Sequence, residues 1–257
     1  MENQKFISRQ NLGKTIYWSP WLGCHKISEA CLNCNVDVTR PFIAKRYSTL
    51  RLENAPAGSV ILTAFSTDFF LEEADPYREQ AWETIKTFPN LIFLIITKRV
   101  DRISKCLPVD WNEGYSNVIL SITVETNQKV AERLPIFAKI PAKHKWLSVA
   151  PILEDINLST YLKAANIECV EVLGEKCFSL NNTKIRPCYY SWFKHLAEQC
   201  KEADLRFSIL ACGDKFNYNE SWHSDNSACY HSILADSLNL DIVKPITFNL
   251  KDITVTI

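Results

Sequence analysis

Short apolar segments alternate with more polar, helix-compatible segments along most of this chain, and that alternation limits the folds open to it. The apolar runs are rich in β-branched residues and have the length of strands. The segments between them carry apolar residues at helical spacing, as Tyr77, Ala81, Trp82 and Ile85 do within 76–87. Such alternation is typical of a parallel sheet with crossover helices. The predicted strands are 15–21, 59–65, 91–96, 117–124, 145–150, 169–173 and 206–211.

Six or seven strand–helix units predict an α/β fold, namely a partial or complete (β/α) barrel of six to seven parallel strands. A doubly wound open sheet is the alternative. The length of 257 residues suits a single domain, and no linker rich in Pro, Gly or Ser interrupts it. The pattern breaks after Gly213, so we expect an irregular extension from about 214, with 246–257 extended. The predicted helices are 36–47, 76–87, a short one through 103, 127–137, 158–165 and 189–203.

Composition excludes several classes of protein. The formal net charge is zero, so no overall field attracts nucleic acid or an anionic membrane. Residues 1–14 lack the apolar core of a signal peptide, and no segment approaches the run of about 18 apolar residues that spans a bilayer. We therefore expect a cytoplasmic protein without a membrane partner. In that reducing compartment, ten cysteines indicate metal binding better than a disulfide framework.

Three cysteines stand close together in the loop that follows the first predicted strand. Cys24, Cys31 and Cys34 have the spacing Cys-x6-Cys-x2-Cys. Thiolates select zinc or iron–sulfur clusters over hard cations. A structural zinc site is normally closed by four ligands, whereas three cysteines on a [4Fe-4S] cluster leave one iron open for a substrate or S-adenosylmethionine. The loop also lies between a strand and a predicted helix, where barrel enzymes build their active sites.

Two other interpretations of these thiols stay open. His25 can complete a Cys3His zinc site, although ligands at adjacent positions are geometrically awkward. Three buried thiols without a metal are the other alternative. Elsewhere, Cys177, Cys188 and Cys212 fall in or near loops, but their spacing matches no compact metal motif, so we expect ordinary buried thiols there.

Charged side chains follow several predicted strands directly, at the edge of the sheet where active sites of this architecture lie. Asp68 can hold a bound amine or ribose, and Lys98 with Arg99 can contact a carboxylate or phosphate. Glu125 can accept two hydrogen bonds from ribose hydroxyls. The alternatives are that the Lys-Arg pair only solvates its loop, and that Glu125 only complements a helix N-terminus.

The cysteine loop, together with the strand-end segments that hold Asp68, Lys98 and Glu125, resembles a known family. The family is that of the phage-associated three-cysteine proteins, a radical-SAM-like group largely of unknown function. The resemblance covers most of 16–213. The first cysteine interval is longer than the commonest radical-SAM form, Cys-x3-Cys-x2-Cys, and some pocket residues usual in the family are replaced. The segments that carry it are 17–34, 67–70, 95–99, 121–128 and 148–153.

The resemblance implies a radical S-adenosylmethionine enzyme. Cys24, Cys31 and Cys34 would hold a [4Fe-4S] cluster with S-adenosylmethionine on the open iron, and Asp68, Lys98 and Glu125 would contact that cofactor or the substrate. Reductive cleavage would release a 5'-deoxyadenosyl radical, which takes hydrogen from an unknown substrate. Such chemistry needs an external electron donor. The phage association suggests a modified nucleotide or nucleic acid as substrate, and a partner protein is compatible with it.

Overall fold

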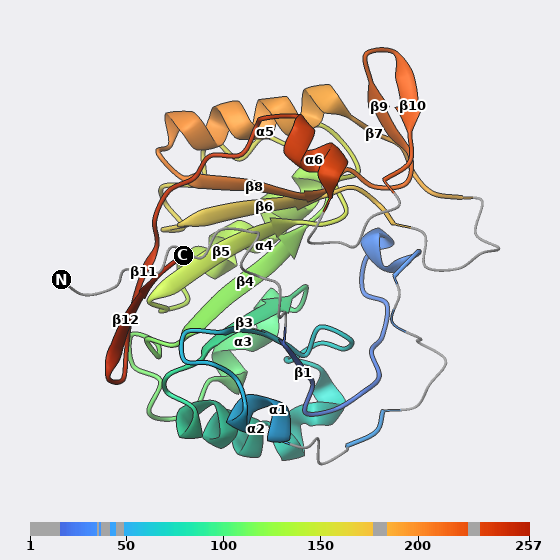
Figure 1. Ribbon diagram of the computed structural model, residues 1–257. Coiled ribbons are helices and arrows are strands. Elements are labelled where there is room, and N and C mark those ends of the chain that lie inside the picture. Colours follow the sequence, from blue (N-terminus) through green and yellow to red (C-terminus); the bar gives the residue numbers. More distant parts are fainter. Residues whose placement is uncertain (1–15, 35, 37–41, 45–48, 177–183, 226–231) are drawn as a thin grey trace.

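A computed structural model of the chain describes residues 16–34, 36, 42–44, 49–176, 184–225 and 232–257. Its centre is a seven-stranded sheet in the order β1-β2-β3-β4-β5-β6-β8, in which every neighbouring pair is parallel. The sheet curls into a half-barrel, which confirms the predicted partial (β/α) barrel (Figure 1). Its strands are β1 (Ile16–Trp18), β2 (Val60–Thr63), β3 (Ile92–Thr97), β4 (Val118–Val124), β5 (His144–Val149), β6 (Cys169–Leu173) and β8 (Arg206–Ala211).

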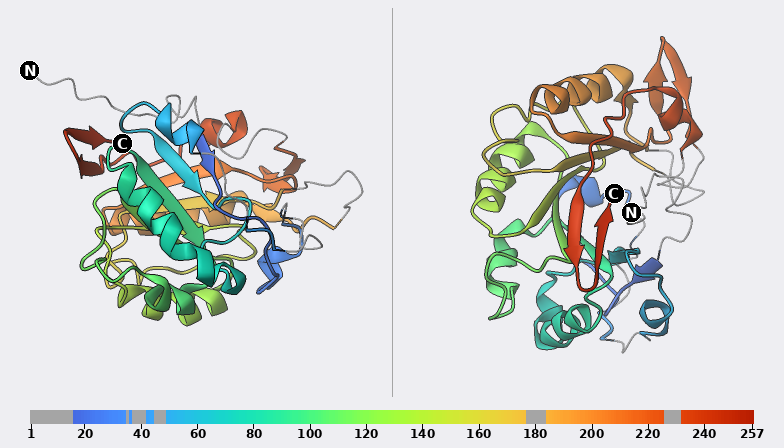
Figure 2. Two further views of the ribbon diagram at one scale, coloured as in Figure 1. Left: turned by 90° about the horizontal axis from the view of Figure 1, so that it is seen from below. Right: turned by 60° about the vertical axis from the view of Figure 1, so that its left-hand side comes forward.

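Helices connect the parallel strands and pack against the outer face of the half-barrel (Figure 2). The largest apolar cluster lies between them and the sheet, and it includes Phe93, Leu120 and Leu147. No helix in the described part of the chain is long and apolar enough to cross a membrane. The helices are α1 (Leu50–Glu53), α2 (Asp75–Thr87), α3 (Val100–Cys106), α4 (Asn127–Ala138), α5 (Tyr190–Glu202) and α6 (Ile233–Ser237).

The inner face of the sheet carries a second apolar cluster. The hairpin formed by β11 (Thr247–Leu250) and β12 (Ile253–Thr256) packs against it, and Phe248 lies 4.1 Å from the His144 ring, centroid to centroid. The predicted extended tail is therefore an antiparallel hairpin, which covers the end of the inner face where the strands begin (Figure 2). The opposite end, where the strands finish, is left for the pocket described below.

Three further differences from the predicted elements concern the connections. Most of the helix predicted over 36–47 lies outside the described residues, and Ile43 makes an isolated bridge with Leu22. The helix predicted over 158–165 is a series of turns, with hydrogen bonds such as Tyr161 N to the Leu158 carbonyl. Beyond 213, β9 (Phe216–Tyr218) joins β7 (Cys188–Tyr189) and β10 (Ser221–His223) in a small sheet that the sequence did not indicate.

Candidate metal centre

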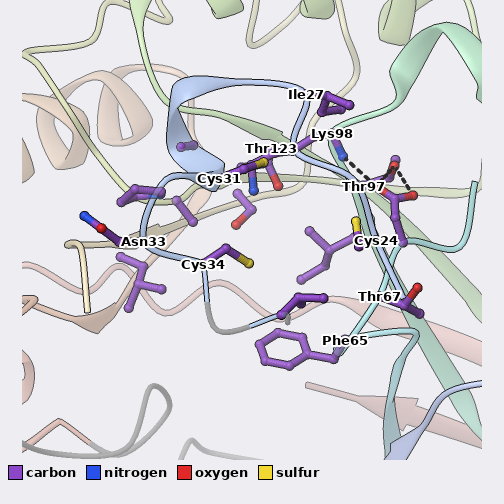
Figure 3. Close-up of a pocket in the computed structure, with 18 of the residues that line it drawn as sticks. Cys24, Ile27, Cys31, Asn33, Cys34, Phe65, Thr67, Thr97, Lys98 and Thr123 are labelled. Atoms are coloured by element: carbon purple, nitrogen blue, oxygen red, sulfur yellow. Dashed lines mark hydrogen bonds between the residues drawn. The ribbon is translucent and has the colours of Figure 1, made fainter. Parts of the chain in front are cut away.

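A pocket of about 200 Å³ lies at the end of the half-barrel where the parallel strands finish. Cys24, Cys31 and Cys34 all line it, as Figure 3 shows. The opposite wall comes from the ends of β4, β5, β6 and β8, through residues that include Thr123, Ser148 and, just beyond β6, Gly174. The fold thus brings the three predicted metal ligands to one cavity, at the edge of the sheet where this architecture places its chemistry.

The end of β2 fixes the start of the cysteine loop. Gly23 pairs with Thr67 in a parallel bridge, and the Thr67 hydroxyl donates a hydrogen bond to the Gly23 carbonyl. Gly23 has a φ of 96°, a left-handed conformation that glycine adopts without a steric cost. Trp21 anchors the preceding residues, since its indole Nε1 donates to the Asp68 carbonyl at 3.0 Å. The loop therefore leaves the sheet in a defined direction, with Cys24 next in sequence.

Arg99 clamps the loop around Cys24. Its Nη1 lies 3.7 Å from the Cys24 sulfur and 3.1 Å from Asp68 Oδ2, and its Nη2 donates to the His25 carbonyl at 3.2 Å. The Arg99 and Asp68 side chains are only 4% and 7% exposed, so they form a buried ion pair. Burial raises the pKa of the Cys24 thiol, and the Asp68 carboxylate adds to that rise, while the Arg99 guanidinium opposes it.

Asp68 is the fixed point of this network. Its carboxylate accepts hydrogen bonds from the Thr97 hydroxyl at 2.7 and 2.9 Å and from the Phe70 backbone N–H at 2.9 Å. With Arg99 and a longer contact from the Lys98 N–H at 3.4 Å, the carboxylate is fully engaged by protein groups. Asp68 lines the pocket, and its carboxylate orients Arg99. Its predicted contact with S-adenosylmethionine stays a prediction.

Lys98 lines the pocket on the side of Cys31, and it is half-buried (Figure 3). Burial alone would raise the pKa of the Cys31 thiol. The charge of Lys98 and the backbone N–H groups of Ile27 and Ser28 outweigh burial, so the pKa of Cys31 is lower than usual. Arg99 and Lys98, which lie between β3 and α3, thus place cations beside two of the three thiols. They lower the pKa of Cys31 on balance, whereas at Cys24 burial outweighs Arg99.

The far side of the cysteine loop is docked on the segment that precedes β7. Asn33 donates to the Lys184 carbonyl at 3.3 Å, and Glu29 lies 4.0 Å from Arg186. Arg186 also donates to the buried Glu175, with its Nε 3.1 Å from both carboxylate oxygens. Burial raises the pKa of Glu175, but hydrogen bonds from Arg186 more than compensate and lower it. The loop is therefore held at both ends, by Arg99 and by the Glu175–Arg186 pair.

Glu125 lies outside the pocket, although it follows its strand directly as predicted. Its carboxylate is fully buried and accepts hydrogen bonds from Arg133 Nη1 at 2.8 Å and Nη2 at 3.5 Å. Arg133 Nη1 also donates to the Thr123 carbonyl at 2.6 Å. The partner that the structure shows for Glu125 is thus an arginine of α4, and its predicted contact with ribose stays a prediction.

The histidine beside Cys24 has another partner. His25 lines the pocket, and its Nε2 pairs with the carboxylate of Glu73. Among the described residues, no group of three His, Cys, Asp or Glu side chains is arranged closely enough to hold a single metal ion. The contact with Glu73 engages Nε2 and leaves Nδ1 of His25 available, so a Cys3His zinc site stays an alternative.

The later cysteines fall into different environments. Cys188 is buried, its sulfur donates to the Cys212 carbonyl at 3.0 Å, and burial raises the pKa of its thiol to about 12. Cys212 is also buried, while Cys177 lies outside the described residues. Cys188 and Cys212 do not line the pocket of the cysteine loop.

Two glycines lock the wall of the pocket beyond β6 and β8. A Cβ on Gly174 would lie 2.0 Å from the Cys212 carbonyl oxygen, and one on Gly213 would lie 2.7 Å from the Gly174 carbonyl carbon. Both close contacts are with backbone atoms, which cannot rotate away. The two loops can therefore touch only because neither residue has a side chain, and this contact holds Glu175 and Lys176 at the pocket.

We expect Gly174→Ala to lower the free energy of unfolding by about 3 kcal/mol, because the new methyl group forces two backbone segments apart. Gly58→Ala is a matched control: its Cβ would meet a side chain, Val255, and its φ is 81°. The left-handed conformation should make Gly58→Ala lose about 1–2 kcal/mol of unfolding free energy, less than Gly174→Ala. Urea unfolding measures both values. Equal losses in the two variants would contradict the locked contact.

The family model described as "Protein of unknown function (DUF5131)" matches residues 53–228, more than half of the chain. The chain belongs to this family. Comparisons with curated proteins and with solved structures found no match. The DUF5131 match contains Asp68, Lys98 and Glu125, whereas Cys24, Cys31 and Cys34 precede it.

The chain is therefore assigned to a family, DUF5131, whose function is unknown. Nothing in the match links DUF5131 to phages or to radical S-adenosylmethionine chemistry, so that part of the resemblance remains a proposal. The residues that sequence reasoning missed are basic partners from other elements, above all Arg133 and Arg186. Arg133 lies on the face of its helix that packs against the sheet, and a charged residue at such a position indicates an oppositely charged partner, here Glu125. No local pattern in the sequence indicates that Arg186 pairs with Glu175.

Proposed function

We propose that this DUF5131 protein is a radical S-adenosylmethionine enzyme whose Cys24, Cys31 and Cys34 hold a [4Fe-4S] cluster. The observation that carries the proposal is the meeting of three thiols in one pocket at the end of a curled parallel sheet. Cysteine thiolates are the usual ligands of such clusters. Barrel architectures also place their chemistry at this end of the strands.

The donor set fits a cluster with one open iron. Among the described residues that line the pocket, the three cysteines are the thiol ligands and His25 is the one imidazole, with its Nε2 on Glu73. A cluster is larger than one metal ion, so its ligands need not converge as closely as those of zinc. When bound, it would coordinate S-adenosylmethionine and supply the electron that splits the sulfonium bond. The described cysteines form no disulfide, in keeping with a reducing, cytoplasmic location.

The residues of the chain itself orient and shield this site. Arg99 fixes the Cys24 sulfur and the His25 carbonyl, and Lys98 places a positive charge near Cys31. These cations would balance the negative charge of a thiolate-bound cluster. The strand ends opposite the loop supply hydroxyl groups, from Thr123 and Ser148, for a polar substrate. An external electron donor is part of the proposal.

Metal content tests the proposal directly. We expect anaerobically purified protein to contain about four irons per chain with matching sulfide. Dithionite and S-adenosylmethionine should then yield 5'-deoxyadenosine. One zinc per chain, with neither iron nor this product after reconstitution, would contradict the proposal and make the loop a structural or hydrolytic zinc site.

A further inference from the structure

The small sheet of β10, β9 and β7 presents one of its two faces to the outside. Side chains that share a register position on neighbouring strands lie on the same face of a sheet. Tyr189 pairs with Asn217, and Asn217 pairs with Trp222, so these three side chains lie in one row. Lys215 comes two residues before Asn217 and therefore points to the same side. The four residues Tyr189, Asn217, Trp222 and Lys215 are called the aromatic face below.

The opposite face of this sheet is directed to the core. Cys188, Phe216 and His223 share the neighbouring register position. Cys188 and Phe216 are buried in the main apolar cluster, and the Phe216 ring lies 5.4 Å from the Phe193 ring of α5, centroid to centroid. Because α5 covers that side of the sheet, the aromatic face points away from the core.

Rings from segments distant in sequence gather on the aromatic face. Trp222 is 54% exposed, and its ring centroid lies 5.8 Å from that of the half-buried Tyr189. Trp192, in the first turn of α5, extends the cluster, with its ring 4.9 Å from that of Tyr189. The Nζ atom of Lys215, an exposed residue, lies 5.6 Å from the centroid of the Trp222 ring. Three rings and one cation thus form a continuous surface, unlike apolar residues exposed singly.

The chemistry of the aromatic face fits an unpaired nucleobase. A tryptophan that keeps half of its surface in water offers a π-face on which a base can stack. Lys215, over this ring, can attract the phosphate that accompanies the base, and the four residues of the face include no carboxylate to repel it. The Asn217 amide, between the two rings, can both donate to and accept from the edge of a base.

A proline-rich peptide fits this surface less well. Such peptides dock in grooves between aromatic side chains. The Tyr189 and Trp222 rings are inclined at 63° to each other, and the Tyr189 and Trp192 rings at 57°, so neither pair forms the parallel walls of a groove for a proline ring. A base needs one ring at a time. The Lys215 ammonium also has a partner in a phosphate, which a polyproline segment lacks.

The aromatic face adjoins the pocket of the cysteine loop. The hairpin of β9 and β10 stands at the same end of the molecule as that loop, on the right in Figure 1. Lys176 lines the pocket and lies 3.1 Å from Asp214, the residue directly before Lys215. A strand bound to the aromatic face would therefore lie beside the pocket.

We propose that the aromatic face binds single-stranded nucleic acid, with a base stacked on Trp222 and a backbone phosphate at Lys215. Because the formal net charge of the chain is zero, stacking rather than a general field supplies most of the affinity. None of the four residues lines the pocket, so this binding does not depend on a metal. That the bound strand is also the substrate of the pocket is the part that rests on the proposed function.

Fluorescence anisotropy of a labelled oligodeoxythymidine with the full-length protein tests the proposal. The strand should bind at least about tenfold more tightly than an abasic strand of the same length, which keeps the phosphates and lacks the bases. Trp222→Ala should weaken binding at least about fivefold, whereas Trp222→Phe, which keeps a ring, should stay within about threefold of the unchanged protein. Lys215→Gln should reduce the slope of log affinity against log salt concentration by about 0.7. The abasic comparison uses the unchanged protein, so it decides even if Trp222→Ala does not fold.

Tyr77→Ala is the matched control, because it removes a similarly exposed ring on α2 and should leave binding unchanged. Equal binding of the intact and abasic strands, or unaltered binding in Trp222→Ala, would overturn the proposal. No saturation up to millimolar protein, with a polyproline peptide bound instead, would assign the face to a protein partner. Iron analysis of the same preparations is a separate readout. Oligonucleotide binding without iron refutes the radical mechanism alone, and iron without oligonucleotide binding refutes the aromatic face alone.

Discussion

Replacing Cys34 with alanine is expected to abolish iron loading and S-adenosylmethionine cleavage together. Cys34 lines the pocket with Cys24 and Cys31, and two thiolates cannot hold a cluster that needs three protein ligands. The side chain is exposed, so its removal leaves no buried cavity and should change the free energy of unfolding by less than about 0.5 kcal/mol. Iron and sulfide analysis, with assay of 5'-deoxyadenosine, measures the effect.

Cys106→Ala is the matched control for this experiment. Cys106 is buried on α3 and does not line the pocket, so its replacement should lower stability by about 1 kcal/mol and leave the iron content unchanged. A Cys34→Ala protein that keeps four irons and still yields 5'-deoxyadenosine would remove the cysteine loop from the mechanism. Loss of iron in both variants would point to misfolding as its cause.

The fold could be predicted from the sequence because each element has its own local pattern. The strands 169–173 and 206–211 have the same bounds in the structure, and four of the predicted helices appear within a few residues of their expected limits. A local pattern did not suffice everywhere. The segment 158–165 has helical spacing but folds as turns, with isolated i to i+4 bonds from Leu162 to Leu158 and from Ala165 to Tyr161. In the small sheet, β7 pairs with β9 of the β9–β10 hairpin, which lies far from it in sequence, and no periodicity encodes that pairing.

The candidate site could be predicted in part for the same reason. The spacing of the cysteines and the position of Lys98 after a strand identify residues that do line one pocket. The sequence does not reveal which cation pairs with which carboxylate. Asp68 and Glu125 look alike as carboxylates at strand ends, yet Arg99 holds one at the pocket wall and Arg133 encloses the other away from it. That difference depends on α3 and α4 packing, which only the folded chain defines.

The second large effect is expected at Arg99. One planar guanidinium contacts Asp68, the Cys24 sulfur and the His25 carbonyl at once. Lysine keeps the charge, but it has a single ammonium group and cannot reproduce this fork. Arg99→Lys should therefore lower the free energy of unfolding by about 1–3 kcal/mol, since groups buried around Arg99 lose hydrogen bonds. It should also loosen the cysteine loop, so that iron loading falls at least about tenfold while the three thiols remain.

Arg102→Lys, a change on α3, separates the role of Arg99, the residue before α3, from a general need for arginine in this part of the chain. Arg102 pairs with Glu72 and Asp75 and donates to the Phe70 carbonyl, with none of these contacts on the cysteine loop. Its replacement should cost about 1 kcal/mol or less and leave iron loading intact. Amide hydrogen exchange over 23–34 provides a readout without metal, in which Arg99→Lys alone should accelerate exchange. Full iron loading and unchanged exchange in Arg99→Lys would show that Gly23, Thr67 and the Glu175–Arg186 pair hold the loop without the clamp.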